Sequence, residues 1–180
     1  MAKLSIFFSF LPLLQYALAA SRTTPPSGAI VVRAGTTTAG EFSTLSAALA
    51  SLPNDDSSQS IFIFPGTYTG QNDITREGPL TVYLWLHDRH HDLHRHQAIL
   101  TAGVSAATAG SDDASGTLHI HKNNFKMYNV NFKNTFGPGS QAIAIAQYGS
   151  QVGLYACGFF GYQDTLYANQ GNAGVPQGVY

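Results

Sequence analysis

Short apolar segments separated by polar turns run along most of the chain, and they predict β-strands. One segment differs: residues 41–52 place Phe42, Leu45, Leu49 and Leu52 at helical spacing and end at Pro53, so they predict an amphipathic helix. Residues 65–68, Pro-Gly-Thr-Tyr, predict a turn. The predicted strands are 29–32, 61–64, 80–86, 98–102, 117–120, 125–132, 142–146, 152–157 and 159–162.

The order of these segments favours an all-β fold. The strands recur every twenty residues or so, and no helical segment between them is long enough to cross over a parallel sheet, which disfavours a Rossmann-type fold. No Asn-Gly or Asp-Gly dipeptide is present to close tight hairpins. A solenoid of short strands with polar corners fits this pattern, with Asn129, Asn131 and Asn134 as candidate corner or ladder residues. The pattern alone leaves a β-sandwich equally open.

Composition excludes some classes of function. The 180 residues carry a net charge of -1 with 11% charged residues, so a charge-driven nucleic-acid binder is excluded. Cys157 is the single cysteine and cannot form an internal disulfide, so we predict a buried free thiol. In the histidine-rich stretch 84–96, His90 and His94 have the i, i+4 spacing of metal ligands on a helix, but the stretch matches no metal motif. This stretch does not fit the pattern of the segments on either side of it, and we interpret it as translated in a shifted reading frame.

The N-terminus predicts a targeting segment. Residues 4–14 are nearly all apolar, and Ala17-Leu18-Ala19 supplies the small residues that a signal peptidase requires. The apolar run is too short to span a bilayer core of about 30 Å as a helix. We therefore predict a signal peptide at 1–19, a single domain at 20–180, and a secreted, extracellular protein without a membrane segment.

The densest group of polar and aromatic residues is Gly161-Tyr162-Gln163-Asp164-Thr165-Leu166-Tyr167, where a carboxylate follows an amide. Read from its residues alone, this segment is a strand that ends in a polar corner, with Asp164 capping a turn. Consecutive strand residues point to opposite faces. If Gln163 and Asp164 serve one cleft, the strand must bulge or turn there, and Gly161 is well placed to allow it.

This motif, together with Cys157-Gly158-Phe159-Phe160 before it, resembles the signature of the pectin methylesterase (pectinesterase) family. Three further blocks resemble the same family: 65–68, 141–145 and 111–118, of which the last resembles its filamentous-fungal branch. The likeness covers roughly residues 29–171, in the family's order. Gly70 stands where the family commonly has glutamate. The resemblance implies a right-handed parallel β-helix, the single-stranded pectin-lyase-like solenoid.

The resemblance also implies a reaction and its residues. The family hydrolyses methyl esters of galacturonate units in pectin, with one aspartate as nucleophile and another as acid and then base. It assigns the acid/base role to Asp164, oxyanion stabilisation to Gln163, a contact with substrate or intermediate to Gln141, and a contact with the sugar chain to Thr117. It implies no metal or organic cofactor, pectin as the partner, and a monomer.

Two blocks of the family are missing from this sequence. The nucleophilic aspartate, in an Asp-Phe-Ile-Phe-Gly-like block, and a later arginine in a Gly-Arg-Pro-Trp-like block have no counterpart before Tyr180. We therefore expect a chain that is truncated relative to the family and inactive by itself. The alternatives are a non-catalytic remnant that binds pectin, or another β-helical pectinase. A lyase would need an acidic calcium cluster, and a polygalacturonase several converging aspartates.

Overall fold

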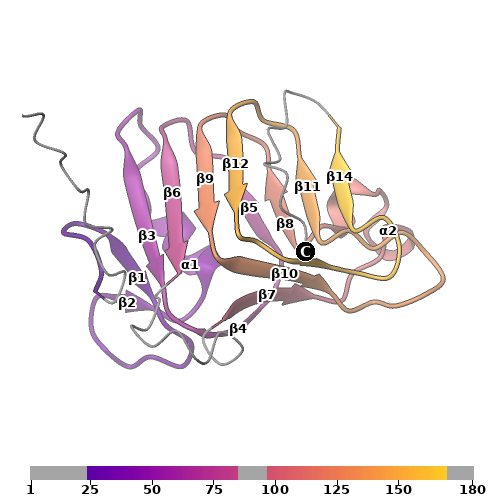
Figure 1. Ribbon diagram of the computed structural model, residues 1–180, viewed down its shortest axis with the longest axis horizontal. Coiled ribbons are helices and arrows are strands. Elements are labelled where there is room, and N and C mark those ends of the chain that lie inside the picture. Colours follow the sequence, from indigo (N-terminus) through magenta and orange to yellow (C-terminus); the bar gives the residue numbers. More distant parts are fainter. Residues whose placement is uncertain (1–23, 85–96, 170–180) are drawn as a thin grey trace, which may run out of the picture.

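All strands of the structure pair in parallel and form three sheets (Figure 1). The computed structural model describes residues 24–84 and 97–169, so the predicted signal peptide and most of the histidine-rich stretch lie outside the described residues. Sheet A has the order β12 (Val152–Tyr155), β9 (Phe125–Tyr128), β6 (Leu80–Leu84), β3 (Gln59–Ile63), β1 (Ile30–Val32), β2 (Glu41–Phe42). Sheet B has the order β13 (Phe159–Phe160), β10 (Val130–Asn134), β7 (Ala98–Ala102), β4 (Gly66–Thr69). Sheet C has the order β14 (Leu166–Ala168), β11 (Ile145–Gln147), β8 (Leu118–Ile120), β5 (Asn72–Ile74).

Each coil of the chain contributes one strand to each sheet. The coils are β3-β4-β5, β6-β7-β8, β9-β10-β11 and β12-β13-β14, and every strand pairs with its equivalent in the next coil. This arrangement confirms the predicted right-handed parallel β-helix. It excludes the sandwich, which needs antiparallel pairs.

The core is a set of apolar rows that run along the solenoid axis. In sheet A, Ile61, Val82, Met127 and Leu154 occupy equivalent positions in successive coils, and all four are buried. Burying a side chain of this size stabilises the fold by about 1.5–3 kcal/mol. In sheet B, Phe132 stacks on Phe159 of the next coil, with ring centroids 5.6 Å apart. The rows give every coil the same cross-section, so polar residues at one register position recur at one place on the surface.

The corner between β9 and β10 is a single residue, Asn129, with φ 61°. Asparagine tolerates this left-handed conformation better than most residues. Asn131 bridges coils, since its amide donates to Gln97 Oε1 and its Oδ1 accepts the Gly158 N–H. The prediction of one strand over 125–132 was therefore wrong, whereas the prediction of asparagine corners is confirmed.

A short helix, α1 (Leu45–Ser51), covers the start of the solenoid and buries Leu45 and Ala48. Thr44 caps it by accepting the Ala47 N–H, so the helix is shorter than predicted and residues 41–42 form β2 instead. The predicted turn at 65–68 is mostly strand β4. No helix in the described part of the chain is long and apolar enough to cross a membrane.

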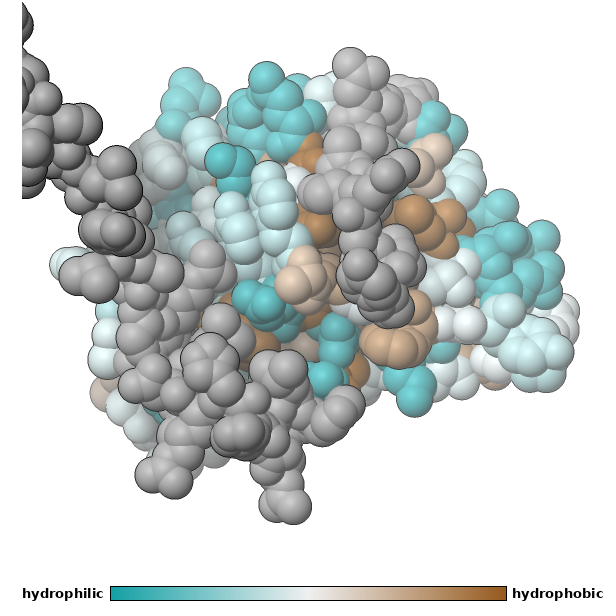
Figure 2. All heavy atoms as spheres, in the orientation of Figure 1, coloured by the Kyte–Doolittle hydropathy of each residue, from teal (hydrophilic) through white to brown (hydrophobic). Residues whose placement is uncertain are grey.

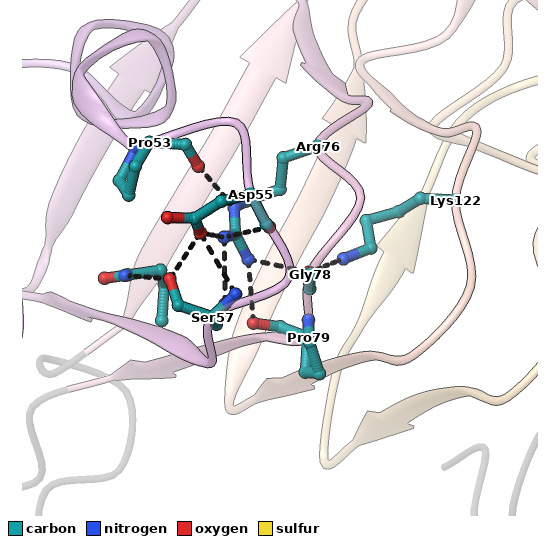
Figure 3. Close-up of polar contacts among 8 residues, drawn as sticks. Pro53, Asp55, Ser57, Arg76, Gly78, Pro79 and Lys122 are labelled. Atoms are coloured by element: carbon teal, nitrogen blue, oxygen red, sulfur yellow. Dashed lines mark hydrogen bonds and ion pairs between the residues drawn. The ribbon is translucent and has the colours of Figure 1, made fainter.

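Arg76 is buried under the loop of residues 53–58 and holds it in place (Figure 3). Its guanidinium donates to the carbonyl oxygens of five residues and to the Asp55 carboxylate, at 2.7–3.3 Å; the carbonyls belong to Pro53, Asp55, Ser57, Gly78 and Pro79. Lys122, also buried, donates to the Gly78 carbonyl from the other side. Burial, together with a smaller contribution from the nearby Arg76 charge, lowers the pKa of Lys122 to about 8.

Candidate active site

Gln163 and Asp164 lie at the corner that leads into β14, beside Gln141 of the previous coil. The Ala142 N–H donates to the Gln163 carbonyl at 3.2 Å, and the Ala144 N–H donates to the Thr165 carbonyl at 2.9 Å. These backbone bonds hold segment 141–145 against segment 163–166. The fold thus brings together three of the four predicted site residues, Gln141, Gln163 and Asp164. The two glutamines are 22 positions apart in the sequence.

The corner itself is made by Asp164, whose φ is 54°. The prediction that the strand turns between Gln163 and Asp164 is confirmed, because residues 161–165 belong to no strand and β14 begins at Leu166. Gly161 was predicted to allow the bulge or turn, but the left-handed residue at the corner is Asp164 and Gly161 does not have a positive φ. Gly161 is instead needed for close packing, since a Cβ there would lie 2.9 Å from Thr165 Oγ1.

Buried hydroxyl and amide groups support Gln141 from below. Ser115 Oγ accepts the Ile143 N–H at 3.2 Å, and Asn134 Nδ2 donates to the carbonyls of Val104, Ser115 and Ile143. Asn134 thus ties β10 to the segment two residues beyond Gln141. Sequence reasoning named Asn134 as a candidate corner or ladder residue but missed this role and missed Ser115. The available signal was a polar residue at the end of an alternating apolar strand.

Thr117 lies inside the fold and not on the surface that carries Gln163 and Asp164. It is fully buried, its hydroxyl donates to the Lys133 carbonyl at 3.2 Å, and its N–H donates to the Ile143 carbonyl at 3.0 Å. The predicted direct contact between Thr117 and a sugar chain is therefore corrected: its hydroxyl has no exposed surface to offer. Its position under Ile143 makes it part of the support of Gln141.

The helix α2 (Ala106–Ala109) borders the site at Gln141. The Ala106 N–H donates to the Gln141 carbonyl at 2.8 Å, and the Ala107 N–H donates to Ser140 Oγ at 3.2 Å. The helix is capped by Ser105, which accepts the Thr108 N–H. Gln141 is consequently held on two sides, by α2 and by the last coil, while its side chain stays half-exposed.

The functional groups of Gln163 and Asp164 are exposed to solvent. No hydrogen bond or ion pair among residues 24–84 and 97–169 engages either side chain or brings a second carboxylate to Asp164. Amide N–H groups can donate to a developing oxyanion, and an exposed carboxyl can exchange a proton with a leaving group. In the same described ranges, no group of three His, Cys, Asp or Glu side chains could hold a metal ion.

Aromatic residues of the last coil divide between core and surface. Phe159 packs against the core, whereas Phe160 and Tyr162 are exposed next to the site. Cys157 is partly buried, and desolvation raises the pKa of its thiol to about 11, so the thiol is a poor nucleophile at neutral pH. The exposed polar groups at this corner are one carboxylate and two primary amides.

The fold and the site together define the protein as a parallel β-helix with an amide and carboxylate site on its surface. A sequence model of the family described as Pectinesterase matches residues 29–172. The chain therefore belongs to the pectinesterase family. It is 39% identical over 151 residues to the probable pectinesterase A of Neosartorya fischeri and 40% identical over 151 residues to pectinesterase A of Emericella nidulans, covering 84% of this chain and 45% of each relative.

Solved structures agree with this assignment. The pectin methylesterase from Aspergillus niger superposes with a TM-score of 0.74 at 38% identity, covering 84% of this chain and 49% of that protein. The pectin methylesterase from carrot gives a TM-score of 0.67 at 25% identity, covering 81% and 44%. The chain thus spans about half the length of the curated relatives it matches.

Proposed function

We propose that this protein supplies the acid/base half of a pectin methylesterase site, acting on methyl esters of galacturonate units in pectin. The observation that carries the proposal is the hydrogen bond from the Ala142 N–H to the Gln163 carbonyl, which sets Gln141 beside the exposed Gln163-Asp164 pair. A pectin methylesterase solved in complex with a hexasaccharide shares the fold, and this likeness is consistent with an extended saccharide as substrate.

In the proposed mechanism, Asp164 first donates a proton to the leaving methoxide. It then accepts a proton from the water that hydrolyses the acyl intermediate. The amide groups of Gln163 and Gln141 donate to the oxyanion that forms when the ester carbonyl is attacked. The left-handed corner serves this division of labour, since it turns the segment between the amide and the carboxylate.

The attacking group is missing from this set. The resemblance locates the nucleophilic aspartate and its arginine in blocks that this sequence does not contain, so we propose that the chain made alone does not hydrolyse pectin esters. Its remaining activity would be binding of pectin at the corner of Gln141 and Asp164. This pectin-binding role is the second candidate function, and the exposed, unpartnered amides favour it.

The test compares two versions of the secreted chain, each beginning at Ala20, where we expect the leader to be cleaved. One version ends at Tyr180, and the other is extended through an Asp-Phe-Ile-Phe-Gly-like block and the arginine block. We expect methanol release from highly methylated pectin only from the extended version. In that version Asp164→Asn, which keeps the shape of the side chain, should lower kcat at least about 100-fold.

Two outcomes would contradict the proposal. Turnover by the short chain that disappears in Asp164→Ala would mean that another residue of this chain is the nucleophile. An extended version that keeps full activity with Asp164→Asn would remove Asp164 from the acid/base role. Asp56→Asn is a suitable control for the loss of activity, because it makes the same change at an exposed carboxylate that lies outside the site.

A further inference from the structure

The outer face of sheet A carries a second, separate set of polar and aromatic side chains. Because strand side chains alternate, residues two apart share a face, and the parallel register aligns them across the coils. Ser60, Thr81, Lys126 and Gly153 form one row, and the next row is Phe62, Tyr83, Tyr128, Tyr155. Figure 2 looks onto this face, where hydrophilic side chains gather at the upper ends of the strands.

A groove of about 430 Å³ runs across this face at the beginning of the strands. Its lining residues come from all four coils: Ser58, Pro79, Thr81, Asn124, Lys126 and Gln151. Neighbouring strands lie about 4.8 Å apart, so four coils give the groove a length of about 14 Å along the solenoid axis. The groove therefore extends along the solenoid axis, and polar side chains from every coil reach it.

Its charge is positive. Lys126 is exposed, no carboxylate lines the groove, and no ion pair within the described ranges 24–84 and 97–169 engages the Lys126 ammonium. The other lining groups are two hydroxyls and two primary amides, which donate and accept hydrogen bonds without charge. This set complements a ligand with many hydroxyls and a carboxylate.

The two amides stand at positions where glycine would be easier to accommodate. Asn124 and Gln151 occupy the same register position in successive coils, and their φ values are 56° and 58°. A left-handed backbone disfavours any residue with a Cβ, and glutamine more than asparagine. The chain nevertheless keeps an amide at both positions, on the lip of the groove.

An aromatic ring lies beyond the groove on the same face, in the last coil. Tyr155 stacks on Tyr128 with ring centroids 4.6 Å apart and leans back over Gly153, where a Cβ would lie 2.6 Å from the ring. Gly153 is the register partner of Lys126, so the ring comes to lie beside the lysine row. Tyr155 remains 38% exposed. An amphipathic ring next to a cation is a favourable surface for an acidic sugar.

We propose that this groove binds a carboxylate-bearing linear polysaccharide, of which demethylated galacturonan is the probe of choice. Lys126 pairs with a carboxylate, Asn124 and Gln151 hydrogen-bond to hydroxyls, and Tyr155 packs against a sugar ring. The groove belongs to sheet A, whereas the candidate active site lies before the strands of sheet C, so this proposal goes beyond the proposed esterase function. The groove would hold the acidic polymer away from the reacting ester.

The experiment measures binding of fluorescently labelled hexagalacturonate to residues 20–180 by anisotropy, at a protein concentration where the chain is monomeric. Lys126→Met should weaken binding about fivefold, the upper range for one exposed ion pair, and Lys126→Arg should restore it. Tyr155→Ala should weaken it about threefold. Lys133→Met removes an exposed lysine from sheet B and should leave affinity within twofold.

Three results would overturn the proposal. Equal losses for Lys126→Met and Lys133→Met would mean non-specific attraction, and equal binding of an uncharged galactan hexamer would remove the carboxylate from recognition. A loss in Asp164→Asn that Lys126→Met does not share would place the saccharide at the candidate active site instead. Circular dichroism of each variant confirms that a change in binding is not a loss of fold, and Lys126→Gln, which removes the charge but keeps a polar side chain, replaces Lys126→Met if that variant fails to fold.

Discussion

The first and the last coils of the solenoid use their polar residues in opposite ways. Near the first coil, Arg76 and Lys122 are buried and donate hydrogen bonds to backbone carbonyls (Figure 3). On the last coil, the side chains of Gln163 and Asp164 are exposed and engage no other described residue. The same coil exposes apolar surface, with Phe160 at 51%, Tyr162 at 70% and Leu166 at 44% exposure.

The contrast separates polar residues that hold the fold from polar residues that can bind a ligand. A buried charge surrounded by carbonyl groups is fixed in one geometry and serves the fold. An exposed carboxylate beside exposed amides has its bonding capacity left for a ligand. The most strongly engaged polar residues are therefore the structural ones, and substitutions in the two regions should separate stability from function.

The largest expected effect is at Arg76. Arg76→Met removes every guanidinium hydrogen bond to the loop 53–58 and leaves buried carbonyls without that donor, so the free energy of unfolding should fall by more than about 3 kcal/mol. Urea unfolding followed by circular dichroism measures it. Arg33→Met is the matched control, because Arg33 pairs with Glu41 near the surface and should cost no more than about 1 kcal/mol. Similar losses for the two variants would contradict a structural role peculiar to Arg76.

A smaller, pH-dependent effect is expected at Lys122. Its pKa of about 8 in the folded protein lies below the ordinary 10.5, so the unfolded chain binds more protons between these values. Stability therefore rises with pH through this window, by at most about 1.4 kcal/mol per pH unit. Lys122→Met should lack this rise and should be more stable than the parent at pH 7, because Gly78 O keeps its bond from Arg76.

The measurement for Lys122 is the difference between the two urea-unfolding profiles at pH 7 to 10.5. Taking the difference removes the opposing contribution of Cys157, whose raised pKa makes the fold lose stability above about pH 9 in both proteins. A difference that is constant over this range would show that Lys122 keeps an ordinary pKa in the fold.

The smallest effect on stability, but a clear one on association, is expected on the last coil. Phe160→Ser combined with Leu166→Thr removes exposed apolar surface, and it should reduce concentration-dependent association with little change in unfolding free energy. Light scattering over a concentration series measures it. Phe136→Ser removes an exposed phenylalanine away from this coil and should leave association unchanged. Equal relief by both variants would mean that the last coil is not the associating surface.

Much of the fold could be predicted because inward residues repeat. The predicted strand 98–102 is β7 as found, and Ile61–Phe64 anticipated β3 to within a few residues. The corner at Asn129 was missed although it leaves a signal. Inward positions are spaced by two residues up to Met127, and by three from Met127 to Val130, because the single left-handed residue shifts the phase. The helix was predicted to start at residue 41, but the backbone stays extended through Thr44, which caps the helix, so α1 begins at Leu45.

The candidate site could be predicted only in part. Hydrophobic periodicity says nothing about which coils lie together, so the proximity of Gln141 to Gln163 came from the family resemblance and from no local pattern. Thr117 shows the opposite failure, because a position taken from a motif block proved to be interior once Lys133 and Ile143 closed around it. Burial depends on neighbouring coils, which a linear motif does not represent.

The order of strands in the three sheets has a consequence for how the protein is made. Each strand needs only its equivalent in the preceding coil, which is always synthesised earlier: β6 adds to β3, β9 to β6 and β12 to β9. A coil can therefore be added as soon as it emerges from the ribosome, without waiting for distant sequence. Assembly of this chain has a built-in direction, from the α1-covered first coil toward the coil that carries Asp164.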